Sequence, residues 1–193
     1  MSRSFAVAGM TLVALLAGCT SPDAPTPDAG ADADGSAAST LTPCPEQTGG
    51  PAAGTDLMPA LSFDCPGGGS LDLGQAPGVP TVLNLWGSWC PPCRAEMPLL
   101  QELSEQAGDR LRVVGVISKD GLPQAESFAT DAGVTFASAF DGEGDLMAEL
   151  SINNLPYTYF LDADGALAHV EVGPVTSTDE LRGLVAEHLG VQL

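Results

Sequence analysis

The sequence predicts an α/β fold with a central mixed β-sheet flanked by helices and a β-hairpin extension on its N-terminal side. Two observations lead to this fold class. Short apolar runs alternate with longer segments whose apolar residues recur every three or four positions between residues 82 and 150. A hairpin and a closing helix then follow between residues 157 and 189. The alternation predicts parallel strands joined by helices, and the hairpin adds antiparallel strands, so the sheet is mixed.

The first half of the pattern contains the hairpin extension and the start of the main sheet. The segments 57–63 and 71–73 are predicted as short strands around the turn-forming run PGGG at 66–69. The run 82–86 predicts a buried strand. A helix follows over 91–107, and its apolar face carries Met97, Leu100, Leu103 and Ala107.

The second half continues with the continuous apolar run 113–117, which is typical of a strand buried on both faces. Pro123 begins another helix, and a short strand over 136–140 and a short helix over 146–150 come next. The hairpin pairs 157–161 with 166–172. Ser177 and Glu180 form a capping box that begins the last helix, whose apolar face carries Leu181, Leu184, Val185 and Leu189.

The charge balance is strongly acidic, with 25 acidic and 6 basic residues and a formal net charge of −19. Contacts with phosphate groups need clustered Lys and Arg, so a nucleic-acid-binding role is excluded. Electrostatic docking to anionic lipids is disfavoured for the same reason. We interpret the acidity as a means of keeping an exported protein soluble.

Residues 1–18 are predicted to be a lipoprotein signal peptide. Arg3 is followed by an uncharged stretch over 5–17, which has the length of a signal-peptide core and is too short to span a bilayer. The run LAGC at 16–19 resembles the bacterial lipobox, in which the cysteine is lipidated, here Cys19. The alternative is an ordinary secretory signal that ends near a cysteine. The expected location is extracytoplasmic, with the chain lipid-anchored to the cell membrane.

Residues 19–42 are predicted to be a disordered, lipid-anchored tether, because they contain almost no large apolar side chains and many Ala, Asp, Pro, Ser and Thr residues. Its aspartates repel one another and its prolines stiffen it, which favours an extended spacer. The alternative is a tail with no length requirement. The folded domain is expected over 43–193.

The chemistry is predicted at the WCPPC motif, 89–93. Cys90 and Cys93 follow a buried strand and stand at the start of a helix, where free N–H groups and the helix dipole stabilise a thiolate. Cys90, the outer cysteine, is predicted to be the nucleophile that forms a mixed disulfide, and Cys93 to resolve it. Zinc binding is disfavoured because there is no second close pair of ligands, and a purely structural bridge is disfavoured because so small a loop adds little stability.

Two stretches identify a family. The sequence LNLWGSWCPPCRAEMP at 83–98 resembles the active-site region of thioredoxin-like proteins, most closely the TlpA/ResA group of membrane-tethered thiol–disulfide oxidoreductases. The sequence LPYTYFLDADG at 155–165 resembles the segment in which this family carries a cis-proline facing the disulfide. The resemblance covers residues 57–189 and implies a thioredoxin-like fold.

The resemblance also implies roles for individual residues. Pro156 would be the cis-proline, and the backbone of Leu155 would pair with an extended substrate segment. Thioredoxins carry a buried Asp where this chain has Asn84, which cannot accept a proton. Glu96 matches a family glutamate and would exchange protons with Cys93, if burial raises its pKa. The alternative for Glu96 is a solvated first-turn glutamate that the helix dipole favours.

The residues beside the cysteines complete the predicted substrate-binding surface. Trp89 would offer an aromatic face to partners and Trp86 would pack beneath the site, with core packing as the alternative for both. Pro91 and Pro92 remove two N–H donors and make the turn rigid.

Cys44 and Cys65 are predicted to form a structural disulfide at the entry to the domain, because an exported location is oxidising. The alternative is a second redox pair that passes electrons to Cys90. His169 and His188 show no partner pattern, and His188 is interpreted as a cap on the end of its helix.

The predicted function is an extracytoplasmic thiol–disulfide oxidoreductase that acts on protein substrates. The resemblance to TlpA/ResA implies a reductant, and that group includes factors of cytochrome c maturation. Expected partners are exported protein thiols and disulfides, a membrane thiol–disulfide electron donor or acceptor, and the membrane itself through Cys19. We expect no metal and no cofactor beyond the Cys90–Cys93 disulfide.

Alternative functions are a disulfide-forming oxidase, a copper-handling thioredoxin-like module, and a peroxidase of the peroxiredoxin type. Thioredoxin-like copper carriers use a wider cysteine spacing and a distal histidine ligand, neither of which is found here. A peroxidase would attack peroxide with one cysteine and would not need a close pair.

Overall fold

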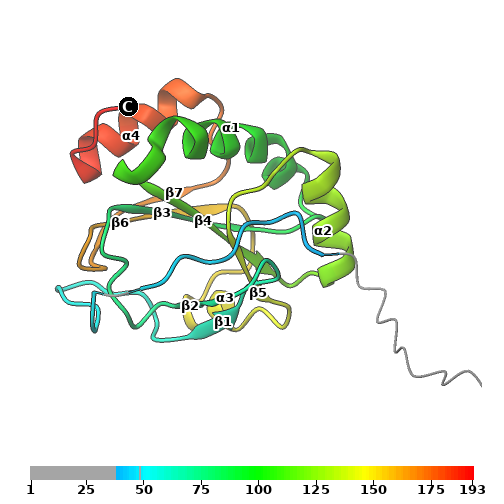
Figure 1. Ribbon diagram of the computed structural model, residues 1–193, viewed down its shortest axis with the longest axis horizontal. Helices are drawn as coiled ribbons and strands as arrows, with labels where there is room; N and C mark the ends of the chain where they lie inside the picture. The colour runs from blue at the N-terminus through cyan, green and yellow to red at the C-terminus, as the bar shows by residue number, and fades with distance from the viewer. Residues whose placement is uncertain (1–37, 48) are drawn as a thin grey trace, which may run out of the picture. The chain divides into compact units, whose positions relative to one another are not determined.

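The computed structural model describes residues 38–47 and 49–193 (Figure 1). Five strands form one mixed sheet in the order β5-β4-β3-β6-β7, and two further strands form a separate antiparallel hairpin. The strands are β1 (Ser62–Asp64), β2 (Ser70–Asp72), β3 (Thr81–Trp86), β4 (Arg112–Ser118), β5 (Ser138–Asp141), β6 (Tyr157–Leu161) and β7 (Leu167–Val172). The helices are α1 (Pro91–Ala107), α2 (Leu122–Asp131), α3 (Asp145–Glu149) and α4 (Thr178–Leu189), and a short 3₁₀ turn spans Gly108–Arg110.

The central strands are apolar because both faces of the sheet are covered. Figure 1 shows α1 and α4 beside each other on one face, with α3 and the β1–β2 hairpin on the other. Every residue of β3 is buried, and β4 is buried after its first residue. A strand with two covered faces reads as a continuous apolar run, which is why both strands could be predicted from the sequence.

The strand directions bring four segments to one edge of the sheet. β3 runs parallel to β4, with Trp86 opposite Ile117, so both strands end at this edge. β6 runs antiparallel to β3, so it begins there, with Tyr157 opposite Leu85. β7 runs antiparallel to β6 and ends there, with Val172 opposite Tyr157. The loops that leave this edge carry the functional residues.

Predicted and observed elements differ mainly at the periphery. The helix α1 has the predicted bounds, whereas the first predicted strand is reduced to β1 at its C-terminal end. Leu57 pairs instead with Ala166 in an isolated bridge, and Pro59 has no N–H to donate to a ladder. The predicted strand 136–140 is displaced toward the C-terminus as β5, because the register with β4 begins at Ser138.

The N-terminal segment of the described chain packs on the domain. Leu41 is only 3% exposed, and Thr42 N–H donates to Thr135 O at 2.8 Å. Cys44 N–H donates to Gly68 O at 2.8 Å, and Cys44 is disulfide-bonded to Cys65. These contacts begin two residues before the predicted domain start at 43. The predicted signal peptide, Cys19 and most of the predicted tether lie outside the described residues.

In the part of the chain from residue 38 onward that the structure describes, no helix has the length and apolar character needed to cross a membrane.

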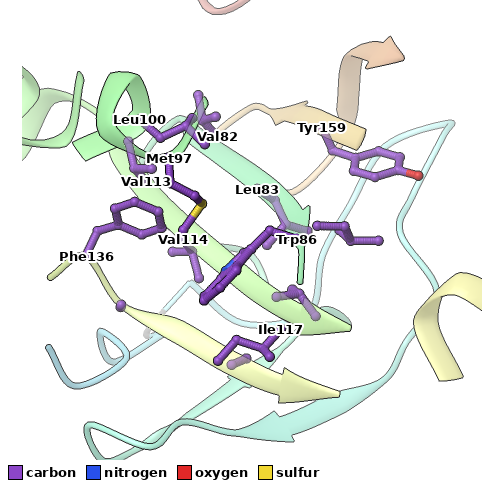
Figure 2. Close-up of a cluster of buried hydrophobic side chains, with 14 of the residues drawn as sticks. Val82, Leu83, Trp86, Met97, Leu100, Val113, Val114, Ile117, Phe136 and Tyr159 are labelled. Atoms are coloured by element: carbon purple, nitrogen blue, oxygen red, sulfur yellow. The ribbon is translucent and has the colours of Figure 1, made fainter. Parts of the chain in front are cut away.

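The core beneath the helices is tightly packed. Figure 2 shows Met97 and Leu100 of α1 directed into the same cluster as Val82 and Val113 of the central strands. Gly115 lies in β4, opposite Asn84 of β3 and Ser138 of β5. A Cβ atom at Gly115 would lie 2.4 Å from Ser138 Oγ and 2.6 Å from Trp86 Nε1, so no larger residue fits without movement.

We therefore expect Gly115→Ala to lower the free energy of unfolding by about 1–3 kcal/mol, the usual cost of overpacking a core. Gly183→Ala is the matched control, because no heavy atom lies within 4 Å of the Cβ it would add in α4. That variant should be neutral or stabilising by about 0.5–1 kcal/mol. Urea unfolding measures both, and equal stability of the two variants would contradict the packing argument.

Candidate active site

Cys90 and Cys93 form a disulfide at the N-terminus of α1. Cys90 is the N-cap residue, and its Sγ atom accepts a hydrogen bond from the backbone N–H of Cys93 at 3.2 Å. Pro91 and Pro92 occupy the first two helical positions and have no N–H, so the amide of Cys93 is the first that can donate. After reduction, this donor and the helix dipole would both favour a thiolate on Cys90.

The two cysteines are almost equally covered. Cys90 is 2% exposed and Cys93 0%. Cys90, the cysteine predicted to be the outer one, is therefore only slightly more exposed than Cys93. Pro91 is exposed beside them and Pro92 is half-buried. In this oxidised state the two cysteines are almost fully covered, and neighbouring residues such as Pro91 form the surface around the disulfide.

The loop after β4 holds the segment that precedes Cys90. The indole Nε1–H of Trp89 donates to Lys119 O at 2.9 Å, and Ser88 donates to the Asp120 carboxylate from both its N–H and its hydroxyl. Trp89 remains 51% exposed, whereas Trp86 is buried. Trp86 is therefore a core residue, and Trp89 presents an aromatic face to solvent.

The segment before β6 contributes the predicted proline. The peptide bond between Leu155 and Pro156 is cis, as the resemblance implied, and both residues are buried. The carbonyl of Pro156 accepts a hydrogen bond from Gly173 N–H at 3.1 Å. The loop that follows β7 is thereby fixed to the segment that begins β6.

Glu96 lies one turn after Cys93 in α1 and is completely buried. Its Oε1 accepts a hydrogen bond from Asn84 Nδ2 at 2.9 Å, and its Oε2 accepts one from Val175 N–H at 3.1 Å. Burial raises the pKa of Glu96 from 4.5 to about 7, and the two hydrogen bonds offset part of this rise. The alternative of a solvated first-turn glutamate is wrong.

Sequence reasoning missed the partners of Glu96. Asn84 stands where thioredoxins carry Asp, and its amide contacts Glu96 and also Thr158, with Nδ2 3.0 Å from Thr158 Oγ1. Asn84 and Thr158 stand opposite each other in the β3–β6 pair. The available signal was a polar residue in the middle of the apolar run 82–86, but its partners depend on strand pairing.

Arg94 is a second residue that the sequence did not single out. Its guanidinium lies 4.5 Å from the centre of the Phe128 ring, and its Nη1 donates to Ser88 O at 3.2 Å. Phe128 in turn packs against Trp86, with ring centres 5.9 Å apart. This stack joins the first turn of α1 to α2 beside the disulfide.

The two histidines lie together, although their spacing suggested no partner. The rings of His169 in β7 and His188 in α4 are parallel within 2°, with centres 3.9 Å apart, and His169 also meets Glu171 at 3.4 Å. Phe160 packs against both rings. No cluster of three or more potential metal ligands occurs within 38–47 and 49–193.

In a comparison with known protein families, the family described as Redoxin matches residues 52–186 of this chain. The chain belongs to the Redoxin family. Among relatives, the thioredoxin-like protein YneN of Bacillus subtilis is 32% identical over 124 residues, which cover 63% of this chain and 72% of YneN. The thiol:disulfide interchange protein DsbE of Escherichia coli is 39% identical over 97 residues, which cover 50% of this chain and 51% of DsbE. The chain thus spans about half the length of DsbE.

Solved structures of similar proteins have the same fold. A secreted disulfide oxidoreductase of Mycobacterium tuberculosis, described as homologous to E. coli DsbE, matches with a TM-score of 0.59 and 28% identity over 66% of this chain and 96% of its own. StoA of B. subtilis matches with a TM-score of 0.55 and 25% identity over 64% of this chain and 96% of its own. The predicted thioredoxin-like fold is confirmed, and the chain's relatives in this family include thiol–disulfide oxidoreductases, the reaction class that the cysteine motif predicted.

The raised pKa of Glu96 makes a prediction about stability. A carboxyl whose pKa rises from 4.5 to about 7 on folding favours the folded state in its protonated form. This contribution is complete below the unfolded pKa and is lost as the pH rises through the folded one, which amounts to about 3 kcal/mol. The oxidised chain should therefore lose stability between acidic and mildly alkaline pH.

Urea unfolding at a series of pH values measures this loss. Glu96→Gln should remove it, whereas Glu149→Gln, which removes an exposed carboxylate from α3, should keep it. An unchanged pH dependence in Glu96→Gln would contradict the assignment of the pKa to this group.

Proposed function

We propose that this protein is an extracytoplasmic thiol–disulfide oxidoreductase of the TlpA/ResA type that reduces disulfides in exported proteins. The observation that supports this most directly is the arrangement of Cys90, Cys93 and Glu96 along the first turns of α1. One sulfur caps the helix, the second lies inside it, and a buried carboxyl follows one turn later.

In the proposed reaction the Cys90 thiolate attacks a substrate disulfide. A bond forms between Cys90 and one substrate sulfur, and the other substrate sulfur leaves as a thiolate. Cys93, once deprotonated, attacks the Cys90 sulfur and releases the second substrate thiolate. Two electrons have then moved to the substrate, and the protein is left with the Cys90–Cys93 disulfide that the structure contains.

Glu96 is proposed to accept the proton of Cys93 during the second step. Its pKa of about 7 lies near neutrality, where a carboxyl can both take up and release a proton. The group lies one helical turn from Cys93 and is shielded from solvent. The transfer would therefore occur inside the domain.

Substrate proteins are proposed to bind across Trp89, Pro91 and Pro92 on one side of the disulfide and the backbone of Leu155 on the other. The exposed indole supplies apolar contact area, and an extended substrate segment would pair with the Leu155 backbone. Pro156, whose peptide bond is cis, would lie beside this backbone.

The proposed function also requires a location outside the cytoplasm and a supply of electrons. We propose that residues 1–18 are removed, that Cys19 is lipidated, and that residues 19–42 act as the tether. A membrane dithiol would reduce the Cys90–Cys93 disulfide after each turnover, and cytochrome c maturation is a candidate process. The Cys44–Cys65 disulfide is proposed to be structural, since neither cysteine lies at the N-terminus of a helix that would stabilise a thiolate.

Insulin disulfide reduction with dithiothreitol tests the cysteine roles. Cys90→Ser should reduce the rate to the uncatalysed level, because the attacking sulfur is gone. Reduced Cys93→Ser, freed of dithiothreitol before insulin is added, should accumulate a mixed disulfide with the substrate that a non-reducing gel detects. The double variant Cys44→Ser/Cys65→Ser is the control and should retain catalysis. If this variant lost catalysis while Cys90→Ser kept it, Cys44 and Cys65 would be the redox-active pair instead.

The direction of electron flow is tested by the reduction potential of Cys90/Cys93 in equilibrium with glutathione. A reductant should have a potential near or below about −220 mV. A value near about −120 mV would identify a disulfide-forming oxidase instead, and the resemblance to TlpA/ResA would then extend to the fold alone.

Stoichiometric Cu(I) binding without reductase activity would favour the copper-handling module.

A further inference from the structure

The polar cluster beneath the disulfide contains one atom without a partner. Asn84 Oδ1 is one of three buried side-chain polar atoms, among those of the described residues, that make no hydrogen bond. The nitrogen of the same amide is fully used, since Nδ2 donates to Glu96 Oε1 at 2.9 Å and to Thr158 Oγ1 at 3.0 Å. A buried unpaired oxygen costs free energy, so its position needs a reason.

The observed orientation of the amide suits an ionised Glu96. Asn84 donates to one carboxylate oxygen, and Val175 N–H donates to the other. A protonated Glu96 would have an O–H group, and if the proton were on Oε1, that donor would face the donor Nδ2. A proton on Oε2 would face the Val175 N–H, which is also a donor. The acid form therefore does not match the orientation that is observed.

A rotation of the Asn84 amide by half a turn resolves this mismatch. Oδ1 would then occupy the place of Nδ2, within hydrogen-bond distance of Glu96 Oε1 and Thr158 Oγ1. Both of those groups can act as donors to it, the carboxylic acid through its O–H and the threonine through its hydroxyl, and an amide oxygen accepts two hydrogen bonds. Each orientation leaves one end of the amide unpaired, so the protonation state of Glu96 decides between them.

We infer that Asn84 is a positioning residue with two amide orientations, which donates to the Glu96 carboxylate in one and accepts from the Glu96 carboxylic acid in the other. This inference rests on the proposed uptake of a proton by Glu96. An ionised Asp at position 84 would lack the donor, and an apolar residue would lack both functions. Asn is the side chain that serves both states of its neighbour.

The surroundings of Glu96 support this role because they offer no charged alternative. The groups that contact its carboxyl are Asn84 from β3 and the Val175 amide from the loop after β7. Thr158 from β6 is linked to it through Asn84, and Cys93 lies one turn earlier in α1. No charged side chain contributes to its altered pKa. Rotation of one amide would let Glu96 gain or lose a proton while α1, β3 and β6 stay in place.

Nuclear magnetic resonance of the isotope-labelled, oxidised full-length chain tests the inference directly. The Glu96 carboxyl carbon and the two side-chain amide protons of Asn84 are followed from about pH 5 to about pH 9, a range that brackets the titration. We expect both amide protons to move upfield on acidification with the midpoint of Glu96, because both lose their acceptors when the amide rotates. The decisive measurement uses the unaltered sequence.

Two variants make the result interpretable. Thr158→Val should move one amide proton upfield at high pH, which identifies the proton that faces position 158. Glu96→Gln should make both signals independent of pH. If Glu96 titrates while the proton facing Thr158 keeps its position, the amide is fixed and this inference is overturned alone. If Glu96 does not titrate, the inference and its proposed proton uptake are both overturned.

Discussion

The burial of the Glu96 carboxyl is the constraint on which much of this structure depends. A carboxyl group without solvent needs hydrogen-bond donors, and it receives them from β3 and from the loop after β7. That loop is also bonded to the segment before β6 through Pro156. Helix α1, the central strand and the two loops at the edge of the sheet are therefore positioned by the same buried group.

Helix α1 joins two chemically different environments along its first two turns. At the N-terminus of α1, the sulfur of Cys90 accepts a hydrogen bond from the backbone N–H of Cys93, which favours a negative charge on the sulfur. One turn further, Glu96 lies where negative charge is disfavoured by burial. The first two turns of α1 thus favour a negative charge on Cys90 and a proton on the buried Glu96 side chain.

The sequence allowed prediction of those parts of the site that are local in the chain. The helix α1, the positions of both cysteines at its start and the central strands follow from spacing and apolar periodicity. The pairing of Asn84 with Thr158 and the stacking of His169 on His188 could not be predicted, because each joins residues that meet only through strand register or helix packing. β1 is shorter than predicted for the same reason, because Leu57 pairs with Ala166, a residue that is distant in the sequence.

The two tryptophans give the molecule a built-in optical asymmetry. They are the chain's only tryptophans, they precede the same disulfide, and one is sealed in the core while the other is half exposed. A water-soluble quencher will reach Trp89 and spare Trp86, so their emission separates without any substitution. Docking of a polypeptide beside the disulfide would then weaken or shift the emission of Trp89, and a change within the core would alter the emission of Trp86.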